Sequence, residues 1–337
     1  MSCPCGQLVL GISVTRGVAS IPLGMVRSVR KPDTRRGHVK YAGLQLSTIR
    51  KYNLAIKRFF VWLDSAEKTV PVSLEELDEA VGEYINHLYQ DDLPVGWASD
   101  VVCGFKRFYP KCRKSLQISA GYLRNWNKSV SRTQALPLTS DILMSLVVVS
   151  LLKGETRLAL AFLFGFTCLL RTGEIVSLTP RQLTFLGGGT QLHIALPDSK
   201  GAKRLGRPES VILKQPHIVQ FIAKAVEKMH PSELIYRGTH ASLGRDLTRI
   251  SLSFGLSHRN LTPYGLRRGG ATWLFKESLS YDLVQSVGRW SEAKTSKIYI
   301  NEAMAVLGQY TIPNWGTSKI QSCVKVFTHT LSRYPNL

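Results

Sequence analysis

The chain has 337 residues, 44% of them hydrophobic, which is enough for a substantial core and indicates two domains. Lys and Arg number 44 against 23 Asp and Glu, so the formal net charge is +21 and a polyanion is the most natural partner. The uncharged run Leu158–Leu170 is shorter than the about 20 residues that a membrane-spanning helix needs, so no transmembrane helix is expected. A ribosome-like or membrane-surface protein could be as basic, and charge alone leaves these classes open.

Residues 1–39 are predicted to form a flexible basic extension. Segment 27–40, RSVRKPDTRRGHVK, is rich in Lys and Arg, which favours an arm that lies on phosphates, although a nuclear-import signal fits the same residues. The six cysteines include no CxxC pair, and Cys3-Pro-Cys5 has no His or Cys nearby, so no metal site is expected. We interpret the cysteines as reduced thiols of an intracellular protein, nuclear if eukaryotic and in the nucleoid if bacterial.

Residues 40–131 are predicted to form a small helical domain. Four helices are expected, over 47–63, 74–90, 98–109 and 121–132. Ser73 and Glu76 make a capping-box pattern before the second helix, and Pro110 stops the third. An ordinary amphipathic bundle with solvated basic side chains is the alternative to a nucleic-acid-binding domain. On the second interpretation the basic residues of the first and third helices contact phosphates: Arg50, Lys51, Lys57, Arg58, Lys106 and Arg107.

Residues 132–139 are predicted to be a linker that ends at Ser140, the expected N-cap of the next helix. Two apolar helices are expected over 140–152 and 155–170, followed by two alternating strands, QLHIALP and ESVILK, joined by the basic turn 198–208. More helices follow to about residue 310, and residues 313–337 are poorly patterned and treated as a tail. The predicted fold is therefore mainly α with a small β-sheet.

Three short segments carry residues at spacings that suit chemistry. Arg171 ends the apolar run, and Glu174 follows it by three residues. Tyr264 and Arg267 are one helical turn apart in TPYGLRRGGATWLF, so they face the same way. In VGRWSEAKTSKIYI, a Trp precedes a Tyr by nine residues. These segments, in this order, resemble the tyrosine site-specific recombinases, the phage integrase family.

The resemblance covers residues 40–312. It implies a helical SAM-like core-binding domain over 40–131 and a mixed α/β tyrosine-recombinase catalytic domain over 140–312. The site residues that it implies are Arg171, Lys200, Tyr264, Arg267, Trp290 and the nucleophile Tyr299, with Glu174 in a supporting role. Three positions depart from the family pattern: Tyr264 stands where His is usual, Gln182 where Asp is frequent, and Arg289 separates Gly288 from Trp290.

The chemistry of these residue types agrees with the resemblance. Arginine forks such as Arg171 and Arg267 donate paired hydrogen bonds to non-bridging phosphate oxygens, and the indole of Trp290 is a donor only. In the resemblance Tyr299 attacks the phosphate and Lys200 protonates the leaving 5′ oxygen, with no cofactor, ATP or metal. Lys203 is the rival of Lys200, and further DNA contacts are expected from Lys203, Arg204 and Arg268.

Each residue also has an ordinary structural interpretation. Arg171 could interact with a helix C-terminus, Tyr299 could belong to a core, and Glu174 is expected to orient its helix rather than to do chemistry. Tyr264 is the weakest assignment, because a phenol is a poor base near neutral pH.

The predicted function is site-specific recombination or integration through a 3′-phosphotyrosyl intermediate on double-stranded DNA clamped between the two domains. Monomers are expected to form a homotetramer on two DNA sites, with the segment after Tyr299 docking on a neighbouring protomer or packing back on its own domain. A catalytically decayed DNA-binding derivative and a type IB topoisomerase-like enzyme are the alternatives.

Overall fold

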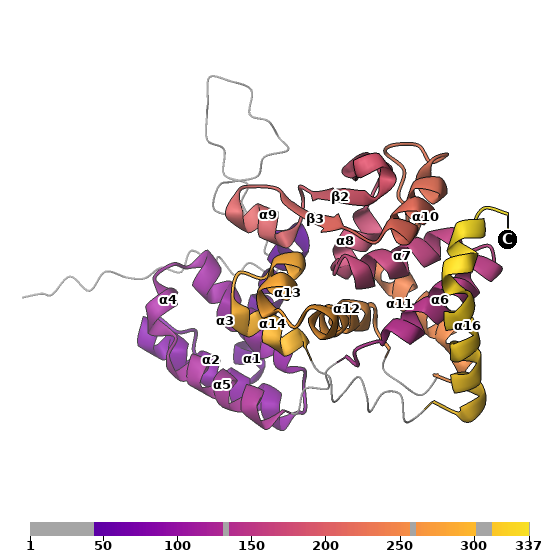
Figure 1. The fold of residues 1–337 in the computed structure, drawn as a ribbon. Coiled ribbons are helices and arrows are strands. Elements are labelled where there is room, and N and C mark those ends of the chain that lie inside the picture. Colours follow the sequence, from indigo (N-terminus) through magenta and orange to yellow (C-terminus); the bar gives the residue numbers. More distant parts are fainter. Residues whose placement is uncertain (1–43, 131–134, 257–260, 301–311, 337) are drawn as a thin grey trace, which may run out of the picture. The chain divides into compact units, whose positions relative to one another are not determined.

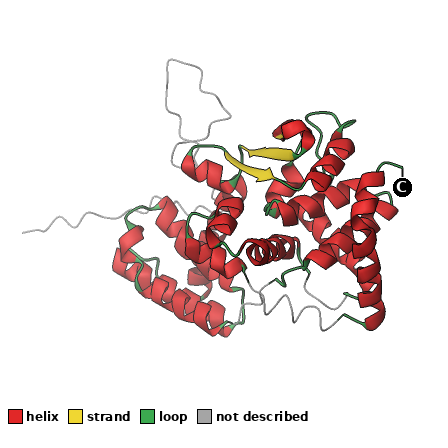
Figure 2. Ribbon diagram, in the orientation of Figure 1, coloured by secondary structure: helices red, strands yellow, loops and turns green. Residues whose placement is uncertain are grey.

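A computed structural model describes residues 44–130, 135–256, 261–300 and 312–336 of the protein (Figure 1). The chain divides into two compact units, residues 1–132 and 133–337. The basic extension, the Cys3-Pro-Cys5 pair and the segment that directly follows Ile300 lie outside the described residues. Within them, the predicted fold class is confirmed: helices dominate, and one small sheet is present (Figure 2).

The first unit is entirely helical in its described part. Its helices are α1 (Leu46–Ser65), α2 (Leu74–Gln90), α3 (Val95–Phe108), α4 (Cys112–Ser115) and α5 (Ile118–Ser129). The core is aromatic at its centre, since the fully buried Phe59 ring lies 5.5 Å from the Phe105 ring and 5.6 Å from the Tyr84 ring, both edge to face. The apolar faces expected from helical periodicity therefore meet in one core.

The start of α2 follows its sequence signal. The Ser73 hydroxyl accepts a hydrogen bond from the Glu76 N–H at 3.0 Å, as a capping box requires. The Glu76 carboxylate reaches back one residue further than expected and accepts from the Val72 N–H at 2.9 Å.

A buried carboxylate joins α2 to α5. Asp78 is 4% exposed and accepts from the backbone N–H groups of Gln117 (2.7 Å), Ile118 (2.8 Å) and Ser119 (2.9 Å), and from the Ser119 hydroxyl. Burial acts to raise the pKa of Asp78, but these donors outweigh it and the net effect lowers the pKa. The side chain thus caps the first turn of α5 from a different helix.

We expect Asp78→Asn to destabilise the first unit by about 2 to 3 kcal/mol, because hydrogen bonds to a buried charge are lost. The lowered pKa means that this stabilisation is complete above the unfolded pKa of about 4 and is lost as the pH falls through the folded value. Urea unfolding followed by tryptophan fluorescence measures the difference. The exposed neighbour Glu79 provides the control, and equal midpoints for Asp78→Asn and Glu79→Gln at pH 7 contradict the prediction.

The second unit surrounds a nearly uncharged helix. Its elements are α6 (Ser140–Leu152), α7 (Thr156–Thr167), α8 (Thr172–Ser177), β1 (Leu183–Leu186), β2 (Gln191–Leu196), α9 (Lys200–Leu205), β3 (Glu209–Leu213), α10 (Pro216–Val226), α11 (His240–Ser251), α12 (Pro263–Ser278), α13 (Tyr281–Gly288), α14 (Ala293–Tyr299) and α16 (Asn314–Arg333). Every residue of α7 from Leu158 to Phe166 is buried, which explains the apolar run. The sheet is antiparallel in the order β1-β2-β3, with Leu192 opposite Leu213.

Two glycines let α12 approach its neighbours closely. A Cβ atom on Gly269 would overlap the Leu138 carbonyl oxygen, and one on Gly270 would overlap the Phe166 carbonyl oxygen at the end of α7. The Leu138 N–H also donates to the Gly265 carbonyl at 3.1 Å. The glycines after Arg267 and Arg268 therefore fix α12 against the core, and with it the depth of both arginines.

Three expectations for this unit need correction. The helix predicted over 155–170 ends at Thr167, because Leu169 adopts a left-handed backbone (φ 49°) and breaks it. The strand β1 was not predicted, since four residues with alternating half-buried and exposed positions give a weak pattern. The basic turn at 198–208 contains a helix, α9, with the Ser199 hydroxyl as its N-cap and Gly206 (φ 68°) ending it.

The prediction that residues 313–337 form a poorly patterned tail is also wrong. Residues Asn314–Arg333 form the 20-residue helix α16, which packs on α6 and α10. Its buried residues recur at helical spacing but are separated by polar ones, so the periodicity is sparse: Ile320, Cys323, Phe327 and Leu331. The helix is part of the core of the second unit.

Candidate active site

Arg171 starts a helix rather than ending one. It is the N-cap of α8, and the Glu174 carboxylate accepts from both the Arg171 N–H (2.8 Å) and its guanidinium (2.7 Å). A cation at a helix N-terminus opposes the helix dipole, and Glu174 offsets that cost. The interpretation of Arg171 as a partner for a helix C-terminus is therefore wrong. Its side chain is 31% exposed, so Glu174 holds the guanidinium while part of the group remains accessible to solvent.

Arg267 is the most deeply placed of the predicted residues. Its side chain is 1% exposed, and its guanidinium donates to the Leu169 carbonyl and, at 2.6 Å, to the Gly288 carbonyl. Burial first, and then the positive charges of Arg171 and Arg289, lower the pKa of Arg267 to about 10, so the group stays charged at neutral pH. Two of five N–H donors are used in these bonds, which leaves three for another acceptor.

Tyr299 and Trp290 cover this guanidinium. Tyr299 is the last residue of α14, and its ring centre lies 4.4 Å from that of Trp290. The Arg267 guanidinium carbon lies 4.8 Å from the Trp290 ring centre and 5.6 Å from the Tyr299 ring centre. Both contacts are cation–π interactions, in which the positive charge of Arg267 attracts the two aromatic rings. The Tyr299 ring also packs against a small buried apolar cluster, as the ordinary core interpretation predicted, but that interpretation does not explain the guanidinium beside the ring.

Tyr264 contacts Tyr299 directly. From the first turn of α12, the Tyr264 hydroxyl donates a hydrogen bond to the Tyr299 hydroxyl, and the two ring centres lie 5.4 Å apart. Burial, and next the bond to Tyr299, raise the pKa of Tyr264 well above its ordinary value. Tyr264 is therefore a neutral donor at this position and not a base, and a donor to the Tyr299 oxygen stabilises a phenolate there.

Lys200 lies at the first position of α9 with an exposed side chain. The preceding Ser199 hydroxyl accepts from the Ala202 N–H at 2.9 Å and donates to the Glu209 carboxylate at 2.6 Å. Glu209 in turn lies 3.7 Å from the Arg171 guanidinium. Glu209 therefore contacts both Ser199, at the start of α9, and Arg171. Lys203, the rival of Lys200, is exposed and lies 3.8 Å from Asp198.

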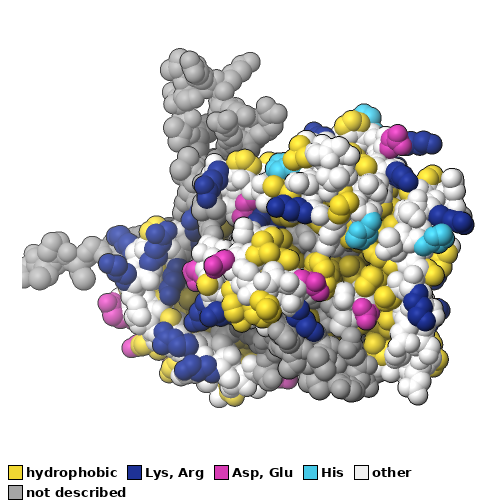
Figure 3. Space-filling model, in the orientation of Figure 1, with side chains coloured by type: hydrophobic (Ala, Val, Ile, Leu, Met, Phe, Trp, Pro, Cys, Tyr) yellow, Lys and Arg dark blue, Asp and Glu magenta, His cyan; other side chains and the backbone are white. Residues whose placement is uncertain are grey.

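The predicted DNA-contact residues fall into two groups. Arg268 is a correction: it is 4% exposed and donates to the Ile298 carbonyl at 3.2 Å, so it anchors α14 instead of facing a ligand. Lys and Arg side chains lie on the visible face of the first unit (Figure 3). Of the residues predicted there, Arg50 and Lys57 are exposed. Lys51 pairs with Asp100 at 3.1 Å, and Arg58 stacks on the Trp97 ring at 3.6 Å. Lys106 and Arg107 are half-buried, and the side chain of Arg204 lies outside the described atoms.

Two charged residues at the site were not predicted. Arg289 is 5% exposed and pairs with Glu174 at 2.6 Å, and Glu209 contacts both Arg289 and Arg171. The sequence signal was an arginine in the unusual place between Gly288 and Trp290. No local pattern marked Glu209.

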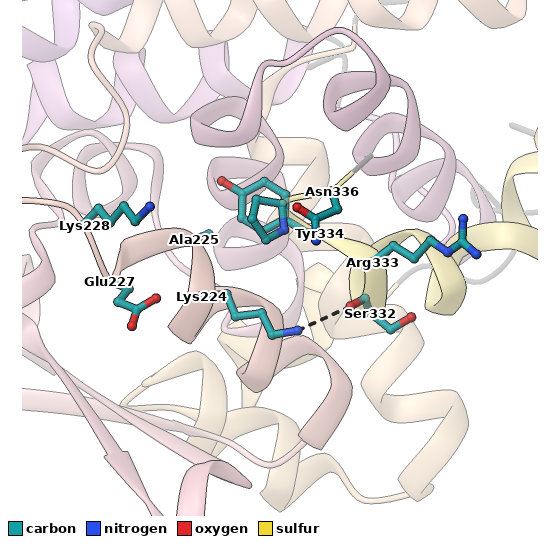
Figure 4. A pocket seen from close by; sticks show the side chains of 9 residues that line it. Lys224, Ala225, Glu227, Lys228, Ser332, Arg333, Tyr334 and Asn336 are labelled. Atoms are coloured by element: carbon teal, nitrogen blue, oxygen red, sulfur yellow. Dashed lines mark hydrogen bonds between the residues drawn. The ribbon is translucent and has the colours of Figure 1, made fainter.

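Other features of the described residues do not compete with this site. No group of three His, Cys, Asp or Glu residues able to hold a metal occurs among them, and none of their helices is long and apolar enough to cross a membrane. A hollow of about 680 Å³ lies between α10 and the end of α16, lined among others by Lys224, Lys228 and Arg333 (Figure 4). It contains none of the predicted catalytic residues, and Lys224 there donates to the Ser332 carbonyl at 3.3 Å.

Comparison with known proteins gives a family match and several structural neighbours. Residues 138–305 match the sequence profile described as "Phage integrase family". XerH site-specific recombinase in a pre-cleavage complex with difH substrate is 19% identical, with a TM-score of 0.50 over 79% of this chain and 80% of that one. Tn1549 transposon integrase in complex with transposon right end DNA is 13% identical, with a TM-score of 0.54 over 78% and 98%. A lambda integrase dimer bound to a COC' core site is 14% identical, with a TM-score of 0.50 over 80% and 73%.

At these identities the structural likeness concerns the fold. A search of curated protein sequences gives no match.

Proposed function

Since this chain belongs to the phage integrase family of tyrosine recombinases, we propose that it cuts and rejoins double-stranded DNA through a 3′-phosphotyrosyl bond to Tyr299. The observation that carries the proposal is the meeting of Tyr299, Trp290 and Arg267 in one cluster, with Tyr264 bound to the nucleophile's oxygen. A phenol held against a buried cation is unusual in a core and suits an attack on a phosphate.

The proposed reaction is an exchange of phosphate esters. The Tyr299 hydroxyl loses its proton to water, its oxygen attacks the phosphorus, the bond from phosphorus to the 5′ oxygen breaks, and a 3′-phosphotyrosine forms. Lys200 donates a proton to the departing 5′ oxygen, and Tyr264 holds the phenolate oxygen by its donated hydrogen bond. The free N–H groups of Arg171 and Arg267 and the indole N–H of Trp290 bind the non-bridging oxygens as charge develops. Attack by a 5′ hydroxyl reverses these steps, so no energy source is consumed.

The partner in this proposal is duplex DNA, contacted by both units, with a homotetramer assembled on two sites. Among the related structures, XerH is bound to difH substrate and a lambda integrase dimer is bound to a core site. The net charge of +21 supports a polyanion partner. The proposed place of action is wherever the cell holds its DNA, the nucleus or the nucleoid.

A second candidate is a DNA-binding protein that has lost catalysis. Tyr264 favours it, because a neutral phenol replaces the usual histidine and occupies the oxygen of Tyr299. The test first selects duplexes that the protein binds from a random pool. A nick is then placed beside the bound site, and the protein is incubated with this nicked duplex. A covalent band on a denaturing gel supports cleavage; specific binding without a band supports the second candidate. Relaxation of plasmid DNA without two-site recombination would indicate a topoisomerase-like activity.

We expect DNA affinity to depend steeply on salt. With about six to ten phosphate contacts, the affinity should fall by about 10³ to 10⁵ between 50 and 200 mM salt. A fluorescence anisotropy titration at several salt concentrations measures the slope. A reversed-charge variant, Lys57→Glu, should lower the slope by about one to two contacts, while the exposed Glu79→Gln should not. A flat salt dependence contradicts the phosphate-contact account.

A further inference from the structure

Arg289 occupies a backbone position that its residue type does not favour. It follows α13 in a left-handed conformation (φ 56°), and its N–H donates to the Ser286 carbonyl at 3.0 Å. Glycine or asparagine is the usual residue there, because the left-handed conformation disfavours longer side chains. The turn itself therefore does not explain an arginine.

The Arg289 side chain turns into the site and not into solvent. It is 5% exposed, and its guanidinium lies 2.6 Å from one oxygen of Glu174 and 3.5 Å from the Glu209 carboxylate. The other oxygen of Glu174 binds Arg171 at 2.7 Å, and Glu209 lies 3.7 Å from Arg171. Two arginines and two carboxylates thus share one cluster, in which each carboxylate contacts both guanidinium groups.

The cluster joins three segments that are distant in the sequence. Glu174 belongs to α8, which begins at Arg171; Glu209 begins β3 and holds Ser199, the cap of the helix that starts at Lys200. Arg289 itself directly precedes Trp290, whose N–H donates to the Gln285 carbonyl at 3.1 Å. The Arg289 side chain therefore contacts Glu174, which binds Arg171, and Glu209, which binds the cap of the Lys200 helix. Its backbone is directly joined to Trp290.

The charges in the cluster predict what removal of Arg289 does. With Arg289, two positive charges face two negative charges. Without it, Arg171 alone faces Glu174 and Glu209, and the local charge becomes −1 where an anionic phosphate must bind. The two carboxylates then compete with the phosphate for the same guanidinium.

We propose that Arg289 is a positioning residue: through Glu174 and Glu209 it sets the orientation of Arg171 and of the Lys200 helix for DNA cleavage, without touching DNA. This inference rests on the proposed function. It assigns a role to a residue that stands outside the sequence motif and to Glu209, which no motif contains.

The test is the single-turnover rate of covalent complex formation on the nicked duplex, measured beside DNA affinity and thermal unfolding. Arg289→Gln should slow the rate by about a hundredfold, as a displaced catalytic group does, with affinity within about threefold of wild type. The double variant Arg289→Gln, Glu209→Gln should cleave faster than Arg289→Gln alone. In the double variant Arg171 faces one carboxylate, that of Glu174, so positive and negative charges are again equal in number. A merely structural role gives the opposite order, since two cluster residues are then lost.

The exposed arginine Arg181, as Arg181→Gln, is the matched control and should cleave at the wild-type rate. If Arg289→Gln fails to fold, Arg289→Lys carries the test: it keeps the charge but not the fork, and should be about tenfold slower at unchanged affinity. A wild-type rate in a folded Arg289 variant, or a double variant slower than Arg289→Gln, overturns the inference. Absence of a covalent complex in the wild-type protein overturns the proposed function instead.

Discussion

Tyr299→Phe should abolish covalent attachment to DNA and leave DNA affinity within about twofold of wild type. The change removes one oxygen, and the ring that packs against Trp290 and Arg267 stays. Only the attack needs the hydroxyl, because the cation–π contact uses the ring face. The covalent band on a denaturing gel, with the nicked duplex as substrate, measures the loss.

Tyr264→Phe is the matched control for this experiment. It removes the other hydroxyl of the same hydrogen bond, so both variants lose the Tyr264–Tyr299 contact. The covalent band should persist in Tyr264→Phe at a rate lower by about tenfold, the scale of one lost hydrogen bond. A band that survives in Tyr299→Phe and disappears in Tyr264→Phe would assign the nucleophile to Tyr264.

Arg171→Lys and Arg267→Lys should each slow cleavage by about a hundredfold or more, the typical loss on removal of a transition-state donor. Lysine keeps the charge and loses the planar fork, so from position 171 it cannot bind Glu174 and also donate two parallel hydrogen bonds to a phosphate. At position 267 it cannot reach both the Leu169 and Gly288 carbonyls and still face a ligand. Single-turnover rates at saturating enzyme measure both effects.

The two arginine variants should differ in stability. Arg171 is partly exposed, so Arg171→Lys should unfold near the wild-type temperature. Arg267 is buried, and a carbonyl left without its donor costs about 1 to 3 kcal/mol, so Arg267→Lys should unfold earlier. Rates are therefore compared well below both unfolding temperatures, with Arg181→Lys as the exposed control. Near wild-type cleavage in both variants would make these arginines structural.

Regular spacing predicted the helical fold, and the resemblance to the tyrosine recombinases grouped Arg267, Trp290 and Tyr299 in one site. The apolar face of α1 and the capping residues before α2 are local signals, and the structure follows them. Tyr264 and Arg267 share one face of α12, so one turn of spacing was enough to place them together. The resemblance supplied the order of the remaining segments.

The parts that could not be predicted depend on contacts between distant segments. Glu174 and Arg289 pair across 115 residues, and nothing near either residue announces the other. Arg268 illustrates the reverse error: its neighbours suggest a basic face, but its guanidinium is buried and donates to the Ile298 carbonyl of α14. The end of α7 depended on one left-handed residue, Leu169, which no propensity indicates.

Peptide mapping of the covalent complex identifies the residue that attacks the phosphate. The complex formed on the nicked duplex is digested with nuclease and trypsin, and the nucleotide-bearing peptide is sequenced by mass spectrometry. Cleavage after Lys297 and Lys319 puts Tyr299 in peptide 298–319, and cleavage after Arg259 and Arg267 puts Tyr264 in peptide 260–267. We predict a phosphonucleotide on Tyr299. Attachment to Tyr264, to Tyr310 or to any other residue would contradict the account.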